Sequence, residues 1–216
     1  PEGVSTVEFT DEVETANAQA RALKERGVEA IVVLLHEGGV QTGTYRQCTG
    51  ISGPVVDIAT NLHPEIDAVI TGHTHQPYNC TIDGKLVTSA FSFGRLVTKI
   101  DLSIDRGSRD VVAKVADNRI VTRDVPKDPR LTGLVTKYAA IAAPLANRVI
   151  GRITSDITRT TNAAGESALG DVIADAQLQA TVPAGFGDAV VAFMNPGGIR
   201  ADFIVDAAMV SRLPRR

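Results

Sequence analysis

The stretch Ala30-Ile31-Val32-Val33-Leu34-Leu35-His36-Glu37-Gly38-Gly39 decides how the first half of this chain is expected to fold. Its first six residues form a continuous apolar run of strand length, which is typical of a strand buried on both faces of a sheet. The run ends at His36, and two glycines follow directly after Glu37. The stretch therefore predicts a buried strand that carries a histidine into a loop.

A second short apolar segment, residues 67–71, repeats this pattern and runs into Gly72-His73-Thr74-His75. Between the two segments, a helix is expected to begin at Pro54, because proline suits the first turn of a helix. The order strand, helix, strand predicts an α/β layer. If the two strands are parallel, both histidine segments lie at their carboxyl ends, where open α/β sheets gather ligand sites.

The remaining elements follow from periodicity. Helical spacing of apolar residues predicts helices over residues 10–27, 128–145 and 166–180. Alternating or continuous apolar residues predict strands over residues 4–9, 86–88, 95–104, 111–115, 149–153 and 188–194, with a hairpin turn at 105–108. The helix that opens at Asp128-Pro129 is expected to join two units, and Pro144 is expected to bend or end it.

Composition excludes several functional classes. The chain has 216 residues, of which 44% are hydrophobic and 22% charged, and this mix is typical of a soluble globular protein with one large or two small domains. The net charge of −3 and the absence of tryptophan argue against a nucleic-acid partner. No apolar run approaches the roughly 20 residues that cross a bilayer, so we expect no membrane span.

Three of the four histidines, His36, His73 and His75, are the candidate metal ligands. Neutral imidazole is a common ligand of transition metals. On extended backbone, residues two apart point to the same side, so His73 and His75 would face one site or two adjacent ones. Any one of these histidines alone would be interpreted as an ordinary loop residue, but their clustering at strand ends favours metal binding.

Cys48 and Cys80 are the only cysteines, and both occur in polar, turn-rich segments. Two buried thiols are one interpretation. An even number of cysteines in loops favours a disulfide, and hence an oxidising compartment.

The motifs resemble those of a known family. Gly72-His73-Thr74-His75 resembles the closing Gly-His-x-His motif of calcineurin-like metallophosphoesterases, and the His36 segment resembles the single-histidine motif that precedes it. Residues 165–176 and Asn195-Pro196-Gly197-Gly198-Ile199-Arg200 are similar to the C-terminal domain of bacterial 5′-nucleotidases and UDP-sugar hydrolases. The resemblance implies a mixed α/β fold in three parts. Residues 1–128 would be the C-terminal half of a metallophosphoesterase αββα sandwich, residues 129–147 a linking helix, and residues 148–216 the first part of a smaller α/β substrate domain.

The resemblance also implies an activity, namely hydrolysis of nucleotide phosphoesters with two divalent metal ions such as Mn or Zn. His36 and His73 would bind one metal, and His75 would help to bind the other. In the substrate domain, Asn195, Gly197, Gly198 and Arg200 would contact the nucleotide. The guanidinium of Arg200 offers a planar fork of donors that suits phosphate oxygens. Together with the cysteine pair, the family implies a secreted, periplasmic or cell-wall location.

Three family motifs are absent from this sequence: Asp-x-His, Gly-Asp-x-x-Asp and Gly-Asn-His-Glu. They would supply the bridging aspartate, an asparagine ligand and the catalytic histidine. We therefore expect an internal segment of a larger enzyme, with no catalytic residue of its own, at most one weakly bound metal and negligible activity alone. Exposed edges of a truncated sheet would also favour self-association. The alternatives are a non-catalytic remnant that binds a metal or a nucleotide, and a single-zinc hydrolase with a three-histidine site.

Overall fold

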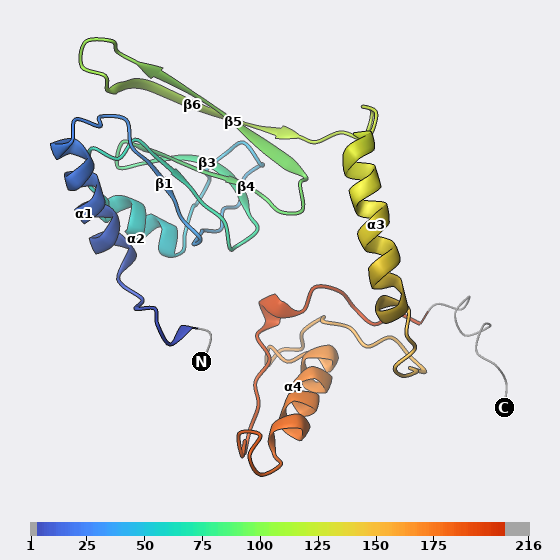
Figure 1. Ribbon diagram of the computed structural model, residues 1–216. Helices are drawn as coiled ribbons and strands as arrows, with labels where there is room; N and C mark the ends of the chain where they lie inside the picture. The colour runs from blue at the N-terminus through green and yellow to red at the C-terminus, as the bar shows by residue number, and fades with distance from the viewer. Residues whose placement is uncertain (1–3, 206–216) are drawn as a thin grey trace. The chain divides into compact units, whose positions relative to one another are not determined.

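The computed structural model describes residues 4–205, and the chain divides into two compact units between Pro126 and Lys127 (Figure 1). This division lies close to residue 128, where the sequence analysis placed the end of the first domain. The assignment of residues 1–128, 129–147 and 148–216 to catalytic, linking and substrate-binding parts stays a prediction. Residues 206–216 of the third part lie outside the described residues.

The first unit is built on a four-stranded sheet with the order β1-β2-β4-β3. β1 (Val32–Leu34), β2 (Ala68–Ile70) and β4 (Lys85–Ala90) are parallel, and β3 (Pro77–Ile82) runs antiparallel to β4. The two apolar strands are therefore parallel, which is the condition under which both histidine segments lie at carboxyl ends of strands. β3 was missed because its polar residues resemble a turn, although its side chains alternate between buried and more exposed positions.

Helices α1 (Glu12–Glu25) and α2 (Pro54–Asn61) lie against one face of this sheet (Figure 1). The side chain of Asp11 caps α1 by accepting a hydrogen bond from the backbone N–H of Glu14, and Pro54 occupies the first turn of α2, as expected. The core between the helices and the sheet is apolar and almost fully buried. It includes Ala20, Val55, Ala59, Val69, Tyr78, Cys80 and Val87.

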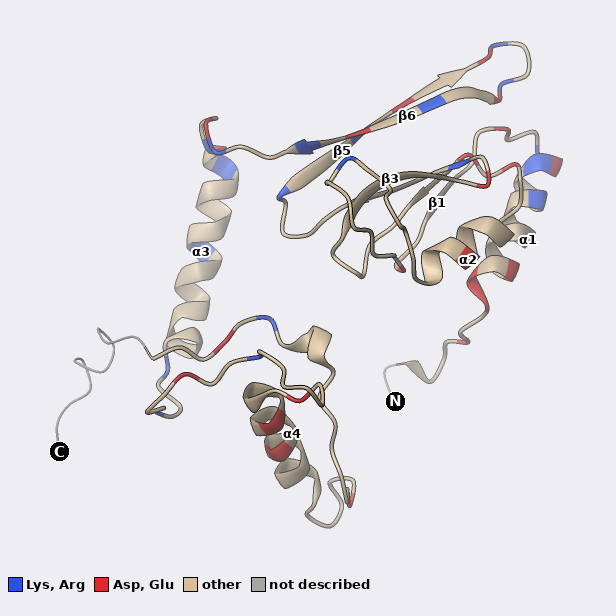
Figure 2. Ribbon diagram, turned by 180° about the vertical axis from the view of Figure 1, so that it is seen from behind, with Lys and Arg blue, Asp and Glu red and all other residues tan. Residues whose placement is uncertain are grey.

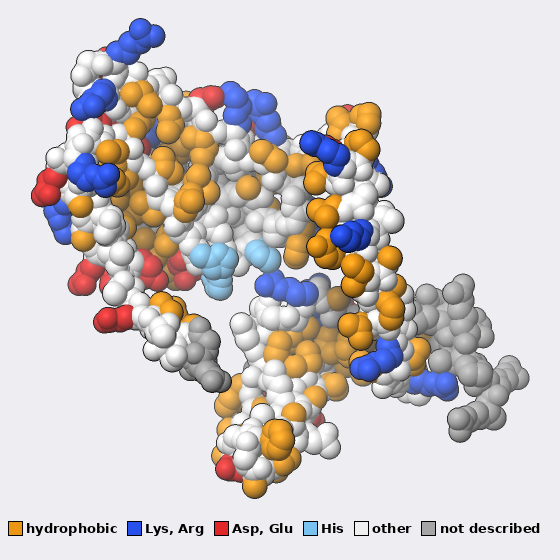
Figure 3. Space-filling view, in the orientation of Figure 1, with side chains coloured by type: hydrophobic (Ala, Val, Ile, Leu, Met, Phe, Trp, Pro, Cys, Tyr) orange, Lys and Arg blue, Asp and Glu red, His pale blue; other side chains and the backbone are white. Residues whose placement is uncertain are grey.

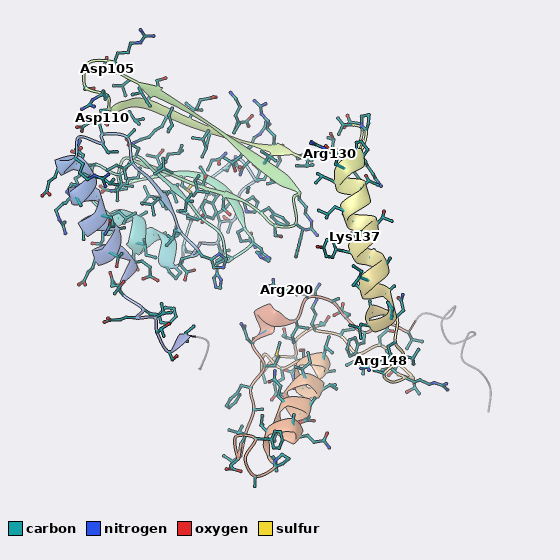
Figure 4. All side chains as sticks on the ribbon, viewed as in Figure 1. Asp105, Asp110, Arg130, Lys137, Arg148 and Arg200 are labelled. Carbon is teal, nitrogen blue, oxygen red and sulfur yellow. A yellow bond between two sulfur atoms is a disulfide. The ribbon has the colours of Figure 1, made fainter. Side chains whose placement is uncertain are left out.

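A long hairpin of β5 (Leu96–Ile104) and β6 (Val111–Ile120) extends along the other side of the sheet (Figures 1 and 2). The turn expected at 105–108 is present, because the carboxylate of Asp105 accepts hydrogen bonds from the N–H groups of Gly107 and Ser108. Figure 4 labels Asp105 and Asp110 at this end of the hairpin. The side chain of Asn118 on β6 is fully buried and joins the hairpin to β4 by donating to the carbonyl oxygen of Ser89.

The expected disulfide is present between Cys48 and Cys80. Cys80 does not lie in a turn, however. It belongs to β3 and is buried in the core, so the bridge ties the long loop between β1 and α2 to the sheet.

The second unit contains α3 (Pro129–Ala146), α4 (Ala168–Thr181) and the short 3-10 helix η2 (Pro196–Gly198). α3 carries few charged side chains (Figure 2) and has no buried residue. Pro144 lies in its last turn and the helix ends two residues later, which agrees with the expected stop. The only backbone bridge seen in the described part of this unit joins Ile157 to Phe203.

Several expected strands are absent. Residues 4–9, 149–153 and 188–194 form no regular strand, and Val190 and Phe193 are 92% and 86% exposed. An apolar run becomes a strand only where a neighbouring strand accepts its hydrogen bonds, and the described residues provide no such neighbour there. β1 is also less buried than expected, because it is an edge strand whose Leu34 side chain is 79% exposed. None of the helices within residues 4–205 is long and apolar enough to cross a membrane.

Candidate functional site

The candidate site lies at the carboxyl ends of the three parallel strands of the first unit. His36 follows β1, His73 and His75 follow β2, and the segment Phe91-Ser92-Phe93-Gly94-Arg95 follows β4. Because β1, β2 and β4 run in the same direction, these three loops emerge at one edge of the sheet. Ligand sites of open α/β sheets are found at this edge.

Hydrogen bonds join the two histidine segments. The N–H of Leu35 donates to the carbonyl oxygen of Ile70 at 2.9 Å, and the N–H of Gly72 donates to that of Glu37 at 3.1 Å. The hydroxyl of Thr74 donates to the carbonyl oxygen of Gly39 at 2.8 Å. These hydrogen bonds extend the parallel pairing of β1 with β2 into the two loops. They hold the segments that carry His36 and His73 side by side.

The rings of His36 and His73 lie together, with 5.5 Å between their centroids and 69° between their planes. Both side chains are exposed, and Figure 3 shows histidine side chains at the surface of the first unit. The ring of His75 instead packs edge-on against Phe93, with 5.5 Å between centroids. The structure thus pairs two of the three candidate ligands and places the third beside an aromatic ring.

The expectation that His73 and His75 share one side assumed extended backbone, and this premise is wrong. Their φ angles are 62° and 53°, so both adopt the left-handed conformation. Non-glycine residues rarely do so, and such residues concentrate at functional sites.

The histidines alone do not make a complete metal site. Within residues 4–205, no group of three or more His, Cys, Asp or Glu side chains is placed to hold a metal ion. Catalytic zinc takes three protein ligands, and here two imidazoles lie together. The described residues therefore do not fit a resident metal by themselves, and the three-histidine zinc site is not formed.

Gln41 organises the loop between His36 and Cys48, and the sequence analysis did not identify it. Its side chain is nearly buried, and its Nε2 donates to the carbonyl oxygens of Gly43, Thr44 and Pro77 at 2.9 to 3.1 Å. No local pattern marks a loop glutamine for this role, because one of its partners lies 36 residues away.

In the second unit, residues 195–200 form an ordered loop. The side chain of Asn195 caps η2 by accepting a hydrogen bond from the N–H of Gly197 at 3.0 Å. A Cβ at Gly198 would lie 2.8 Å from the Cε of Met194, so a larger residue would displace that side chain. Ile199 is buried, whereas Arg200 is exposed and lies beside η2, where Figure 4 labels it.

Arg159 supports the same loop and was also missed. Its Nη1 donates to the carbonyl oxygens of Ile199 and Arg200, both at 3.4 Å, and its Nε lies 3.5 Å from a carboxylate oxygen of Asp202. A hollow of about 650 Å³ lies elsewhere in this unit, along α4 and the residues that follow it, and shares no residue with the loop.

Comparison with known proteins agrees with this geometry. Residues 149–212 match the family model of the 5′-nucleotidase C-terminal domain. Endonuclease YhcR of Bacillus subtilis is 35% identical over 93% of this chain, and cell wall protein Lmo0130 of Listeria monocytogenes is 30% identical over 92%. The chain spans only 16% and 27% of the lengths of these relatives.

Among solved structures, the 5′-nucleotidase precursor from Thermus thermophilus has the same fold over 91% of this chain, with a TM-score of 0.62 and 24% identity. This chain covers 39% of that structure. This likeness shows that the two chains share a fold. The family match and the relatives agree with the resemblance of this chain to 5′-nucleotidases.

Proposed function

We propose that this chain forms part of an enzyme that hydrolyses the phosphoester bond of nucleotides. One observation carries the proposal: His36 and His73, which are 37 positions apart, meet with their ring centroids 5.5 Å apart at the carboxyl edge of a parallel sheet. Clustered imidazoles at such an edge form an incomplete ligand set in a chain related to 5′-nucleotidases.

His36 and His73 are the proposed ligands of one divalent metal ion, and His75 is the proposed ligand of a second. Carboxylates from a longer polypeptide would complete both coordination spheres, since no group of three or more His, Cys, Asp or Glu side chains within residues 4–205 is placed to hold a metal ion. Metal ions held there would supply positive charge that stabilises a phosphate group during hydrolysis. The described chain contributes the imidazoles and the rigid loops that hold them.

The proposed role of the second unit is substrate binding. Asn195, Gly197, Gly198 and Arg200 provide a loop whose backbone is already ordered before a ligand arrives. Arg200 is exposed and suits the oxygens of a phosphate, because its guanidinium can donate two parallel hydrogen bonds.

An extracellular or cell-wall location is part of the proposal. The Cys48–Cys80 disulfide supports it, because such bridges persist in oxidising compartments. The relative Lmo0130 is described as a cell wall protein, which agrees with this location.

Metal binding by the 216-residue chain tests the ligand assignment. We expect His36→Ala and His73→Ala each to weaken Zn²⁺ binding at least about tenfold, in line with losing one of few ligands. His63→Ala is the matched control, because the Nδ1 of His63 accepts a hydrogen bond from the N–H of Glu65 and takes no part in the site. Equal effects of all three substitutions would contradict the assignment.

Hydrolysis tests the function itself. We expect the chain alone to release negligible phosphate from adenosine monophosphate with Mn²⁺ or Zn²⁺. A longer polypeptide that carries the chain should release it and should lose this activity on His73→Ala. An inactive longer polypeptide would favour the alternative, a non-catalytic metal- or nucleotide-binding module, which the incomplete ligand set within residues 4–205 also allows.

A further inference from the structure

The segment Phe91-Ser92-Phe93-Gly94-Arg95, which leaves the carboxyl end of β4, has an unusual backbone. Phe91 and Phe93 have φ angles of 67° and 59°. Of the seven described non-glycine residues with positive φ, four are His73, His75, Phe91 and Phe93. This conformation is unfavourable for bulky side chains and persists only where the surroundings impose it. The two neighbouring loops thus hold four of the left-handed non-glycine residues among residues 4–205.

The side chain of Arg95 is held by the two aromatic rings. Its guanidinium carbon lies 5.1 Å from the centroid of Phe91 and 5.6 Å from that of Phe93, within the range of cation–π attraction. Phe93 in turn packs against the ring of His75. One aromatic ring therefore connects the guanidinium to a histidine of the candidate site.

Folding stability does not account for Phe93. The residue is 75% exposed, so it contributes little of the apolar burial through which phenylalanine usually stabilises a protein. Its backbone conformation is one that glycine would adopt more easily. Both observations indicate that the ring is used for something other than packing the core.

The positive charge of the Arg95 guanidinium is not balanced by a carboxylate among the described residues. Across residues 4–205, no Asp or Glu side chain forms an ion pair with it, and its guanidinium lies near the two aromatic rings. A guanidinium group that lies against an aromatic face still has N–H donors in its own plane. These donors suit the oxygens of a phosphate.

We infer that Arg95 is a phosphate-binding residue of the site formed by His36, His73 and His75, and that Phe91 and Phe93 position it. The anion it binds is the phosphate group of a nucleotide. This inference rests on the proposed function, because that function brings a phosphate to the histidines. An arginine of the first unit would then bind the negatively charged phosphate of the substrate.

Titration of the 216-residue chain with inorganic phosphate tests this inference, followed by NMR of the histidine rings and the Gly94 amide. Arg95→Gln is expected to weaken binding about tenfold or more, the usual effect of losing a hydrogen bond from a charged donor. Arg106→Gln is the control, because Arg106 is an exposed arginine in the β5–β6 turn and its removal changes the net charge equally. Equal weakening by both substitutions would overturn the inference, as would a lack of binding to the unaltered chain.

A second substitution separates positioning from structure. Phe93→Gly places a residue that accepts a φ of 59° at that position, so the melting temperature should stay the same or rise. Phosphate affinity should nevertheless fall several-fold, because Arg95 loses one of its two aromatic contacts. A lower melting temperature with unchanged affinity would show that the ring is only structural. The hydrolysis assay on the longer polypeptide is independent of these results, so either proposal can fail alone.

Discussion

A Cβ atom on Gly38 would lie 2.3 Å from the carbonyl oxygen of Gly72. No real pair of atoms approaches so closely, and the atom in the way belongs to the backbone. The segments that carry His36 and His73 are therefore in direct backbone contact at this point. Only glycine fits at position 38, because any other residue would add a Cβ atom there.

Gly38→Ala should push the two segments apart. We expect the free energy of unfolding of the first unit to fall by about 1–3 kcal/mol, as for other overpacked sites, and the Zn²⁺ affinity of the histidine pair to fall with it. Denaturant unfolding and Zn²⁺ titration measure these two quantities. Gly133→Ala in α3 is the control, because a Cβ there meets nothing within 4 Å and alanine favours a helix. A harmless Gly38→Ala would contradict the close approach.

Asn118 should be one of the most sensitive positions of the first unit. Its side chain is fully buried, and its Nδ2 donates to the carbonyl oxygens of Tyr45 and Ser89 at 2.7 and 3.0 Å. Asn118→Ala removes both of these buried hydrogen bonds and should lower the free energy of unfolding by about 2–4 kcal/mol. Val112→Thr on the same strand is exposed and should change it by less than about 0.5 kcal/mol.

Reduction should weaken the first unit through the Cys48–Cys80 bridge. For a sequence separation of 32 residues, the loss of chain entropy in the unfolded state predicts about 4 kcal/mol of stabilisation. We expect the denaturation midpoint of the unaltered chain to fall on addition of a thiol reductant. The double variant Cys48→Ala and Cys80→Ala should start from the lower midpoint and should not respond to the reductant.

Asp67 predicts a specific dependence of stability on pH. Its carboxylate is nearly buried and accepts a hydrogen bond from the N–H of Ile31 at 2.9 Å, but burial dominates and raises the pKa of this carboxyl above its ordinary value of 3.8. The folded state therefore holds the proton more tightly than the unfolded state. This contribution to stability is complete below pH 3.8 and is lost as the pH rises through the folded pKa.

Asp67→Asn should remove the pH-dependent part of the stability that Asp67 contributes. Relative to the unaltered chain, the variant should gain stability as the pH rises from about 3 to 7 in equilibrium unfolding experiments. Asp105 provides the contrast, because backbone N–H donors at the exposed hairpin turn lower the pKa of its carboxyl. The stability that Asp105 contributes is present above pH 3.8 and is lost on acidification. A relative loss of stability in Asp67→Asn with rising pH would contradict the assignment.

Self-association is expected through the edge strand β1. The Leu34 side chain is 79% exposed on a strand whose outer edge has no partner among the described residues. Leu34→Lys should lower the fraction of dimer or larger species in sedimentation experiments. Leu145→Lys is the matched control, since Leu145 is 77% exposed on α3. An equal effect of both substitutions would show general solubilisation instead of pairing at β1.

The elements that the sequence predicted well are those with a strong local pattern. The apolar runs before His36 and Gly72 became the parallel strands β1 and β2, the helix predicted over residues 10–27 became α1, and Pro54 marked the start of α2. The run at residues 188–194 looks just as apolar but forms no strand, because strand formation depends on a partner that lies elsewhere in the chain. Local pattern contains no information about that partner.

The sequence also predicted only part of the candidate site. The proximity of His36 and His73 follows from two parallel strands, whereas the left-handed backbone that turns His75 towards Phe93 has no signal in the sequence. The Arg95 segment was missed because β4 is separated from β2 by the antiparallel β3 along the chain. The direction of β4, and so the edge at which Arg95 emerges, becomes known only from the pairing of the strands.

The pairing of Val33 with Val69 sets the register of β1 against β2. A slip of one residue would shift His36 by about 3.3 Å along the strand, which is more than half of the 5.5 Å that separates its ring from that of His73. Substitutions deep in the sheet, far from any histidine, would then change the distance between the two rings. Under the proposed function, selection for metal binding by the two imidazoles would therefore also act on the volumes of the valines beneath them.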